Sequence, residues 1–259
     1  MDIQFYKYQG TGNDFIMIDN RSLSFPKNNT TIINKLCDRR FGIGADGLIL
    51  LEPTENYDFK MIYFNADGNE GSMCGNGGRC LVAFAKQLGI IEGETTFIAT
   101  DGEHYATLNN EIVSLKMIDI DCITEEKKYT FLNTGSPHHV EFIKNVSTIN
   151  VQELGKNIRF GSPYFEEGTN VNFAEQTGKN SFKVRTYERG VENETLACGT
   201  GVTAVAIAAN NNGITKQNSI KIEVLGGKLE VSFEKENNTY KNVFLTGPAK
   251  FVFEGIIKI

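Results

Sequence analysis

Two segments of this 259-residue chain share one order of residue types, and this repeat constrains the fold more than any other feature. Residues 74–85 read CGNGGRCLVAFA, and residues 198–209 read CGTGVTAVAIAA. Each segment is a cysteine, a glycine-rich turn and a run that is apolar on nearly all sides. This pattern predicts buried helices over residues 77–88 and 201–210. We interpret the repeat as an internal duplication of one helix-centred unit.

Most of the remaining chain is typical of strands. Apolar runs predict strands at residues 15–19, 47–52, 59–65, 112–120, 139–143 and 182–187. The alternating run 220–234 predicts a hairpin that turns at Gly226-Gly227. Shorter helices are predicted over residues 34–39 and 151–154.

The length and the duplication predict two domains. The polar run 121–130 is the expected crossing point, and we expect the C-terminal segment to return to the first half. The first domain would comprise residues 1–121 with 248–259 and carry Cys74. The second would comprise residues 122–247 and carry Cys198. Because no long linker separates the halves, we expect them to face each other across a cleft.

Charge and composition exclude several function classes. The net charge of -6 disfavours a nucleic-acid or anionic-membrane surface. The N-terminal residues lack the apolar core of a signal peptide, and the longest apolar run, 202–209, is much shorter than the roughly 20 residues that span a bilayer. We therefore expect a cytoplasmic protein. The cysteines are odd in number and form no C-x-x-C pair, which disfavours a disulfide framework and a zinc site.

The repeat places Cys74 and Cys198 at the predicted start of a helix. The first N–H groups of a helix attract anions and favour a thiolate over a thiol. The glycines beside each cysteine leave the backbone uncovered, so one carboxylate could receive hydrogen bonds from both helix starts. Its α-carbon would then lie between two sulfur atoms, where one thiolate removes the proton and the opposite thiol returns one. That is the geometry of racemisation.

The alternative for any single cysteine is that it is buried as a small apolar side chain. Two cysteines in matching contexts make this alternative weaker for Cys74 and Cys198. A Cys74–Cys80 disulfide is disfavoured, because six helical positions turn the second side chain through roughly 240°. We expect Cys37, Cys80 and Cys122 to be core or surface thiols.

Seven segments, two of which include the cysteine motifs, extend the pattern along the whole chain. In order they read GTGNDFIMID, RRFGIGADGLIL, YFNADGNEGSMCGNGGRC, GSPHHV, GTNVNF, YERGVENETLACGTG and GPAKFVFEG. Together they resemble the diaminopimelate epimerase family, whose members interconvert LL- and meso-2,6-diaminopimelate without a cofactor, for lysine and peptidoglycan synthesis. The resemblance implies an α/β fold of the α+β type with two pseudo-symmetric domains, each a curved, mostly antiparallel sheet wrapped around a central helix, with the active site in the cleft between them.

The resemblance also implies roles for individual residues. Cys74 and Cys198 resemble the acid and base, with His138 and Glu188 beside the reacting centre. The remaining residues would bind substrate. The N–H cradle for the reacting carboxylate is Gly75, Asn76, Gly199 and Thr200. The groups that recognise the distal amino-acid end are Asn13, Asn65, Ser136, Asn170 and Arg189, and Glu188 would also contact the substrate. Amides can donate and accept toward a zwitterion, and arginine can bind a carboxylate with two hydrogen bonds. The local alternatives are an asparagine that only makes a turn and a histidine that only bonds backbone.

Two positions depart from the family pattern. Many members have asparagine where this chain has Ser136, and some have glutamine where this chain has Gly47. The serine can still donate one hydrogen bond, but one amide is missing and must be replaced by water or a neighbour.

Other readings remain open at this stage. A proline or hydroxyproline racemase-like enzyme, or a phenazine-biosynthesis-like isomerase, could share the fold. A proline-type substrate would not require Asn65, Asn170 and Arg189 together. A non-catalytic binding or thiol-redox protein is the alternative outside enzymes. We expect neither cofactor nor metal, because two thiols already supply acid and base and no lysine for pyridoxal phosphate lies in either cysteine motif. The expected partner is a small-molecule substrate, and the pattern leaves room for a homodimer.

Overall fold

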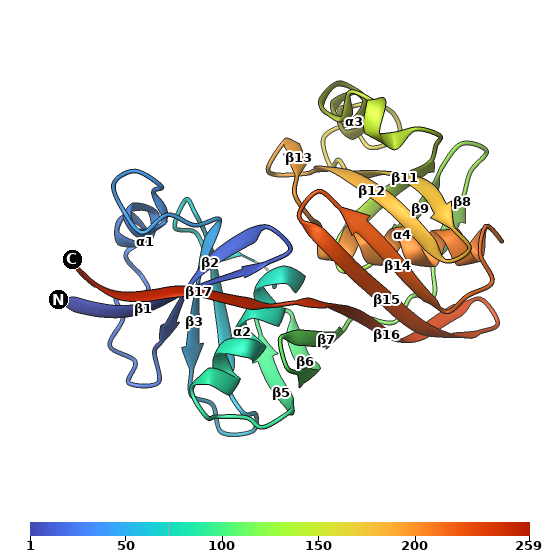
Figure 1. Cartoon of the computed structure of the whole chain (residues 1–259). Coiled ribbons are helices and arrows are strands. Elements are labelled where there is room, and N and C mark those ends of the chain that lie inside the picture. The colour runs from blue at the N-terminus through green and yellow to red at the C-terminus, as the bar shows by residue number, and fades with distance from the viewer. Residues whose placement is uncertain (72) are drawn as a thin grey trace. The chain divides into compact units, whose positions relative to one another are not determined.

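The computed structural model describes residues 1–71 and 73–259 and has the mixed α/β composition that the sequence predicts (Figure 1). The chain divides into two compact units. The first comprises Met1–Leu115 with Gly247–Ile259, and the second comprises Lys116–Thr246. Each unit is a sheet of mostly antiparallel strands built around one buried helix. None of the described helices is both long and apolar enough to cross a membrane.

The first unit alternates strand pairs with helices. In chain order it contains β1 (Asp2–Gly10), β2 (Asn13–Asp19), α1 (Thr30–Cys37), β3 (Gly47–Glu52), β4 (Lys60–Asn65), α2 (Gly75–Gln87), β5 (Glu94–Ala99), β6 (Gly102–Asn109), β7 (Ile112–Lys116) and, from the C-terminus, β17 (Lys250–Lys258). β1 and β2 pair antiparallel, β2 and β3 parallel, and β3 and β4 antiparallel. β4 then meets β5 in parallel, and β5, β6 and β7 continue antiparallel.

The second unit repeats this order. It contains β8 (Ile123–Glu125), β9 (Thr130–Asn133), β10 (Pro137–Phe142), η1 (Val146–Thr148), α3 (Val151–Phe160), β11 (Asn170–Gly178), β12 (Ser181–Glu188), β13 (Asn193–Thr195), α4 (Gly199–Asn211), β14 (Ser219–Val224), β15 (Gly227–Glu236) and β16 (Thr239–Pro248). β9 and β10 pair antiparallel, β10 and β11 parallel, β11 and β12 antiparallel, and β12 and β14 parallel. The same pairing order in both units supports the internal duplication.

The C-terminal strand belongs to the first unit. β17 pairs antiparallel with β1 along nearly its whole length, and the two strands run side by side in Figure 1. The ends of the chain are joined, since the amino group of Met1 donates to the carbonyl of Ile259 at 2.7 Å.

The central helices are buried because small apolar residues cover them on all sides. Every residue of α4 from Val202 to Ala209 is fully buried, and Leu81, Val82 and Phe84 of α2 are equally inaccessible. Burying one such Val, Leu or Phe side chain contributes roughly 1.5–3 kcal/mol, so these helices anchor their sheets. In each unit, the sheet therefore fixes where the first turn of its helix lies.

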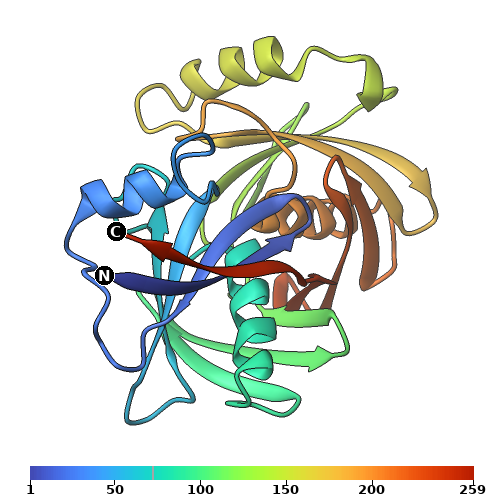
Figure 2. The same cartoon turned by 60° about the vertical axis from the view of Figure 1, so that its left-hand side comes forward.

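The outer helices α1 and α3 begin at asparagine caps. The side chain of Asn29 accepts from the N–H of Ile32, and that of Asn150 accepts from the N–H of Glu153. α3 lies across β11 and β12 (Figure 2) and packs through Val151 against the buried side chains of those strands.

Several element boundaries differ from the sequence prediction. α1 begins at Thr30, four residues before the predicted start, because Asn29 caps it, and it ends at Cys37. α3 continues to Phe160, and the strand predicted over 112–120 ends at Lys116. The predicted hairpin is present, but its turn is Leu225-Gly226, because Gly227 already pairs with Val224. The sequence prediction also missed the strands β1, β5, β6, β8, β9, β11, β13, β16 and β17.

Candidate functional site

Cys74 is the N-cap residue of α2 and is half-buried. The first bond of the helix runs from the N–H of Gly78 to the carbonyl of Cys74 at 2.7 Å, so the N–H groups of residues 75–77 precede the helical ladder. A side chain at Gly77 would place its Cβ 2.8 Å from Ile49 Cδ1, which explains the glycine there. As predicted, a thiol and backbone donors lie together at the positive end of a helix.

Asn76 connects this helix start to the beginning of β2. It is almost fully buried, and its Nδ2 donates to Oδ1 of Asn13. Asn13 in turn donates from Nδ2 to Asp46 at 3.0 Å. The structure thus brings Asn13, Asn76, Gly75 and Cys74 of the prediction together.

Arg79 is a fully buried cation in the first turns of α2 that the sequence prediction missed. Its guanidinium donates to Thr11 Oγ1 at 2.8 Å, to Asn76 Oδ1 at 3.0 Å and to the carbonyl of Gly75 at 3.4 Å. The bond to Oδ1 orients the Asn76 amide so that Nδ2 faces Asn13. Burial lowers the pKa of Arg79. Negative charge at the nearby Cys80 and Cys74 would raise this pKa, but the effect of burial is larger.

Asn65 and Gly47 lie opposite each other at the end of the β3–β4 pair. Asn65 is exposed. A Cβ at Gly47 would lie 2.5 Å from the Tyr63 ring and 3.1 Å from its hydroxyl. Tyr63 therefore fills the space that a larger residue at position 47 would need.

Cys198 is the N-cap residue of α4, at the place in the second unit that Cys74 has in the first. The helix ladder starts with the bond from Val202 N–H to the Cys198 carbonyl at 3.0 Å. The Cys198 Sγ lies 3.5 Å from the Thr200 hydroxyl. Gly201 is required here, because an added Cβ would lie 2.4 Å from Asn172 Oδ1 and 3.3 Å from Sγ of Cys198.

His138 extends this contact away from the sulfur atom. Its Nε2 lies 2.9 Å from the Thr200 hydroxyl, and its Nδ1 lies 3.1 Å from Nδ2 of Asn172. Burial and then the positive charge of Arg189 lower the pKa of His138 to about 3. The imidazole is therefore neutral near pH 7 and carries one proton.

Asn170 organises the other predicted residues of the second unit. Its Nδ2 donates to Ser136 Oγ at 2.9 Å and to the carbonyl of Pro137 at 3.0 Å, while its Oδ1 accepts from the N–H of Arg189 at 2.9 Å. Ser136 accepts this bond, which leaves its own O–H as a donor. The Arg189 guanidinium is exposed and donates through Nη1 to the backbone carbonyl of Glu167 at 2.9 Å. Glu188 ends β12 directly before it.

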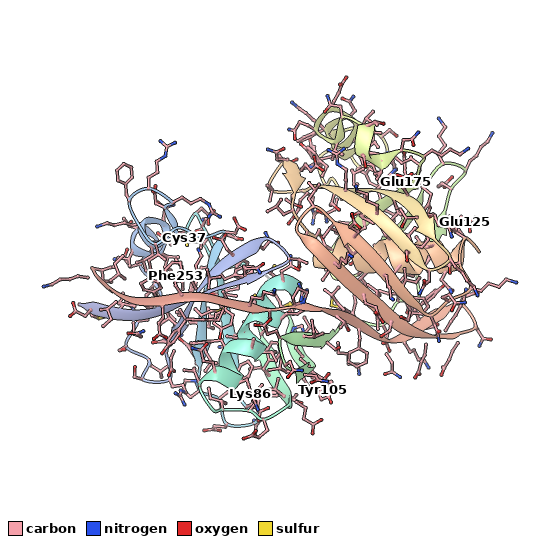
Figure 3. All side chains as sticks on the ribbon, viewed as in Figure 1. Cys37, Lys86, Tyr105, Glu125, Glu175 and Phe253 are labelled. Atoms are coloured by element: carbon pink, nitrogen blue, oxygen red, sulfur yellow. The ribbon has the colours of Figure 1, made fainter. Side chains whose placement is uncertain are left out.

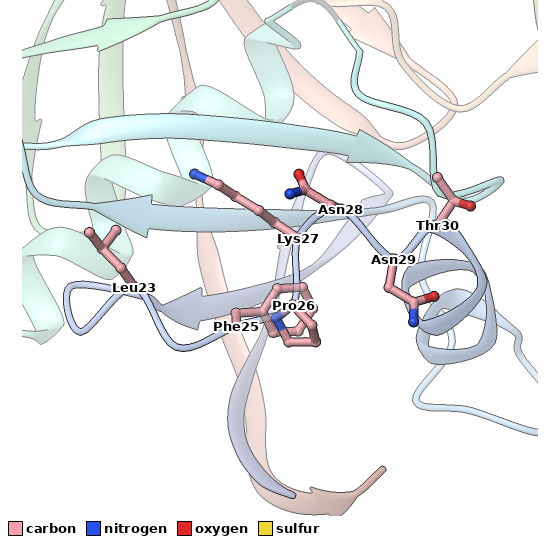
Figure 4. A pocket seen from close by; sticks show the side chains of 7 residues that line it. All are labelled: Leu23, Phe25, Pro26, Lys27, Asn28, Asn29 and Thr30. Carbon is pink, nitrogen blue, oxygen red and sulfur yellow. The ribbon is translucent and has the colours of Figure 1, made fainter.

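Of the other cysteines, Cys80 lies close to Arg79 inside α2, and none begins a central helix. Burial raises the pKa values of Cys37 and Cys80 to about 12, and Cys122 is exposed. Cys37 ends α1, and Lys86 lies in the last turn of α2, opposite the Cys74 end (Figure 3). The segment that connects β2 to α1 lines an open pocket of about 610 Å³ (Figure 4), and none of the predicted site residues contributes to it. The lining residues are Leu23, Phe25, Pro26, Lys27, Asn28, Asn29 and Thr30. Within residues 1–71 and 73–259, His, Cys, Asp and Glu side chains form no cluster of three that could hold a metal ion.

The sequence prediction missed the buried residues that hold the predicted site residues in place. Arg79 had a local signal, since a charge stands in an otherwise apolar helix run. Asn172 had a weaker one, because it is an asparagine inside the alternating segment NVNF. Thr11 and Thr186 had none, because their hydroxyls acquire meaning only from partners distant in sequence.

Comparison with known proteins shows the family of the chain. The family model for diaminopimelate epimerase matches residues 5–113 and 130–252. The chain is 60% identical to diaminopimelate epimerase of Flavobacterium psychrophilum, over 98% of this chain and all of that protein. It is 41% identical to diaminopimelate epimerase of Aquifex aeolicus, over 98% of this chain and 97% of that one.

Solved structures share the fold at low sequence identity. A phenazine biosynthesis protein of the PhzF family from Bacillus anthracis matches with a TM-score of 0.78 and 14% identity over the whole of both chains. A hydroxyproline epimerase from Agrobacterium vitis matches with a TM-score of 0.70 and 13% identity, over 99% of this chain and 92% of that one. These likenesses confirm the predicted fold class, whereas the sequence matches decide among families that share it. The chain belongs to the diaminopimelate epimerase family.

Proposed function

We propose that this chain interconverts LL- and meso-2,6-diaminopimelate without a cofactor, with Cys74 and Cys198 acting on opposite faces of one α-carbon. The observation that carries the proposal is that each of the two buried central helices begins directly after a cysteine. Family membership supports the substrate, and the paired thiols support the reaction type.

Epimerisation at an α-carbon needs a base on one face and an acid on the other. A free thiol has a pKa of about 8.5, so both thiol and thiolate are accessible near neutral pH. The helix N-terminus favours the thiolate, and the paired sequence motifs supply one such group for each face. In one direction Cys198 would remove the proton and Cys74 would return one, and in the other direction the roles reverse.

The reacting carboxylate would bind to the backbone N–H groups at the start of both helices. In α2 these are the groups of Gly75 and Asn76, and in α4 those of Gly199 and Thr200, all ahead of the first helical bond. These donors also stabilise the negative charge that moves onto the carboxylate as the carbanion forms.

The distal amino-acid end would be recognised by polar groups at the strand ends. We assign this role to Asn13, Asn65, Ser136 and Arg189. The exposed guanidinium of Arg189 is suited to a carboxylate, because its planar fork can donate two parallel bonds. Asn170 would act by holding Ser136 and the Arg189 backbone in place. At the edge beside Gly47, the phenol of Tyr63 would replace the missing amide.

The family resemblance further implies a cytoplasmic enzyme of lysine and peptidoglycan synthesis, and we keep the homodimer as a proposal. Size-exclusion chromatography with light scattering tests the assembly: a mass near 29 kDa at working concentration would remove the dimer.

Incubation of the purified chain with LL-diaminopimelate, followed by chiral separation, tests the proposed activity. The meso isomer should form, and Cys74→Ala and Cys198→Ala should each abolish its formation, whereas Cys122→Ala at an exposed position should not. L-proline and trans-4-hydroxy-L-proline serve as competing substrates. Turnover of either in place of diaminopimelate would overturn the substrate assignment.

A further inference from the structure

A chain of hydrogen bonds leads from the interior of the second unit to the sulfur of Cys198. It passes from Asn172 to His138, from His138 to Thr200 and from Thr200 to Cys198, over distances of 3.1, 2.9 and 3.5 Å. Asn172 and His138 are fully buried. Each of these groups can donate one hydrogen bond and accept another. The direction in which the hydrogen bonds are donated therefore depends on Asn172, where the series begins.

The amide of Asn172 has one orientation that satisfies its neighbours. Its Oδ1 accepts from the hydroxyl of Thr186 at 3.0 Å, on the strand residue directly opposite. Its Nδ2 donates to the carbonyl of His139 at 3.0 Å. A flipped amide would point an oxygen at that carbonyl, which cannot donate. Nδ2 therefore faces His138 as a donor.

This orientation decides the rest of the chain. Because Asn172 donates to Nδ1, the single proton of the neutral His138 must be on Nε2. Nε2–H then donates to Thr200 Oγ1, and the Thr200 O–H turns toward the sulfur. Arg189 is the charged group that acts on His138, and it favours the neutral ring. A hydroxyl that donates to sulfur stabilises a thiolate over a thiol.

We propose that Asn172 is a positioning residue, which fixes the Nε2–H tautomer of His138 and thereby directs the Thr200 hydroxyl toward Cys198. The Cys198 thiolate is stabilised by this relay together with its helix N-terminus. Cys74 is close in charge to Arg79. The proposal rests on Cys198 being an acid/base thiol, but its test needs no substrate.

The isosteric variant Asn172→Asp tests the direction of the relay. A carboxylate accepts at both oxygens, so His138 should move its proton to Nδ1, accept from Thr200 at Nε2 and draw the hydroxyl away from sulfur. NMR of ¹⁵N-histidine-labelled protein, with His138 assigned by His→Gln variants at the other histidines, reads the tautomer directly. The wild type should show Nε2–H. An Nδ1–H tautomer in the wild type would overturn the proposal.

Alkylation of Cys198 by iodoacetamide at pH 7, quantified by peptide mass spectrometry, tests the consequence. Asn172→Asp should slow the alkylation about threefold to tenfold, because the thiolate fraction of Cys198 falls. The remaining thiolate becomes more nucleophilic, which offsets part of this loss. Cys74 in the same molecules is the matched control, and its rate should stay within about twofold. An unchanged Cys198 rate would contradict the relay.

A double-mutant cycle with Thr200→Val separates the relay from the new charge and from general loosening. In the Thr200→Val background, Asn172→Asp should have little further effect, since the hydroxyl is already gone. An equal slowing in both backgrounds would mean that Asn172 does not act through Thr200. If Asn172→Asp does not fold, Asn172→Ala removes the donor to Nδ1 without adding a charge and should give a mixture of His138 tautomers. A single Nε2–H tautomer in that variant would count against the role of Asn172.

Discussion

Replacing Arg79 by methionine removes the buried cation at the start of α2 while keeping most of its volume. Two buried oxygens, Thr11 Oγ1 at 2.8 Å and Asn76 Oδ1 at 3.0 Å, then lose a donor. Each unsatisfied acceptor costs about 1–3 kcal/mol. The substitution also removes a buried charge and an Nε that has no hydrogen-bond partner among the described residues. Because both are unfavourable in the folded state, their removal offsets part of the loss in stability. We expect a net destabilisation of about 2 kcal/mol.

Urea unfolding, combined with hydrogen exchange of the α2 amides, measures this loss. Arg21→Met is the matched control, because Arg21 is exposed and pairs with Asp19 at the surface, where an ion pair contributes about 0–1 kcal/mol. Without the cation, the Cys74 thiolate is less favoured, so alkylation of Cys74 should slow while that of Cys198 does not. A variant as stable as wild type with unchanged Cys74 reactivity would refute our account of Arg79.

Three other predictions concern single positions. Ser136→Asn should change KM for diaminopimelate more than kcat, since the position acts in binding; a fall in kcat at constant KM would place it in the chemistry. Gly155→Ala should lower the unfolding free energy by about 1–3 kcal/mol, because the added Cβ would lie 2.3 Å from that of Tyr187, and an unchanged urea midpoint would show that α3 can shift. Burial raises the pKa of Asp14, but hydrogen bonds from Arg39 and a lysine outweigh it and lower the pKa to about 2. This stabilisation is complete above the unfolded value of about 4 and is lost as pH falls through 2, so Asp14→Asn should flatten the stability curve between those values; a curve that keeps its acid limb would contradict the pairing.

Local sequence was enough to predict the two central helices and the cysteine beside each of them. A cysteine, two glycines and a run of small apolar residues predict buried helices over 77–88 and 201–210. α2 begins at Gly75 and α4 at Gly199, so each helix starts two residues earlier than predicted, directly after its cysteine. The pattern needs no distant partner, because the helix start is decided within one turn. The same holds for the strands at 47–52 and 182–187, whose apolar runs coincide with β3 and β12.

Long-range partners decided what the sequence missed. Arg79 and Thr11 are 68 residues apart, and Asn172 and His138 are 34 apart, so nothing in either neighbourhood predicts their contact. β1 was missed although its residues alternate in burial, since Lys7 interrupts the apolar pattern and is buried by its ion pair with an aspartate. The hairpin turn was placed one residue late because two successive glycines can each take the turn position.

In the proposed reaction, two thiols, one for each face, exchange different protons with the α-carbon. Early turnover of LL-diaminopimelate in D₂O, followed by mass spectrometry of both isomers, measures this exchange. The returning sulfur has exchanged with solvent, so the meso product should carry deuterium at the inverted α-carbon while the remaining LL substrate starts out unlabelled. Product that largely retains the original hydrogen would mean a single shuttling base and would contradict the account.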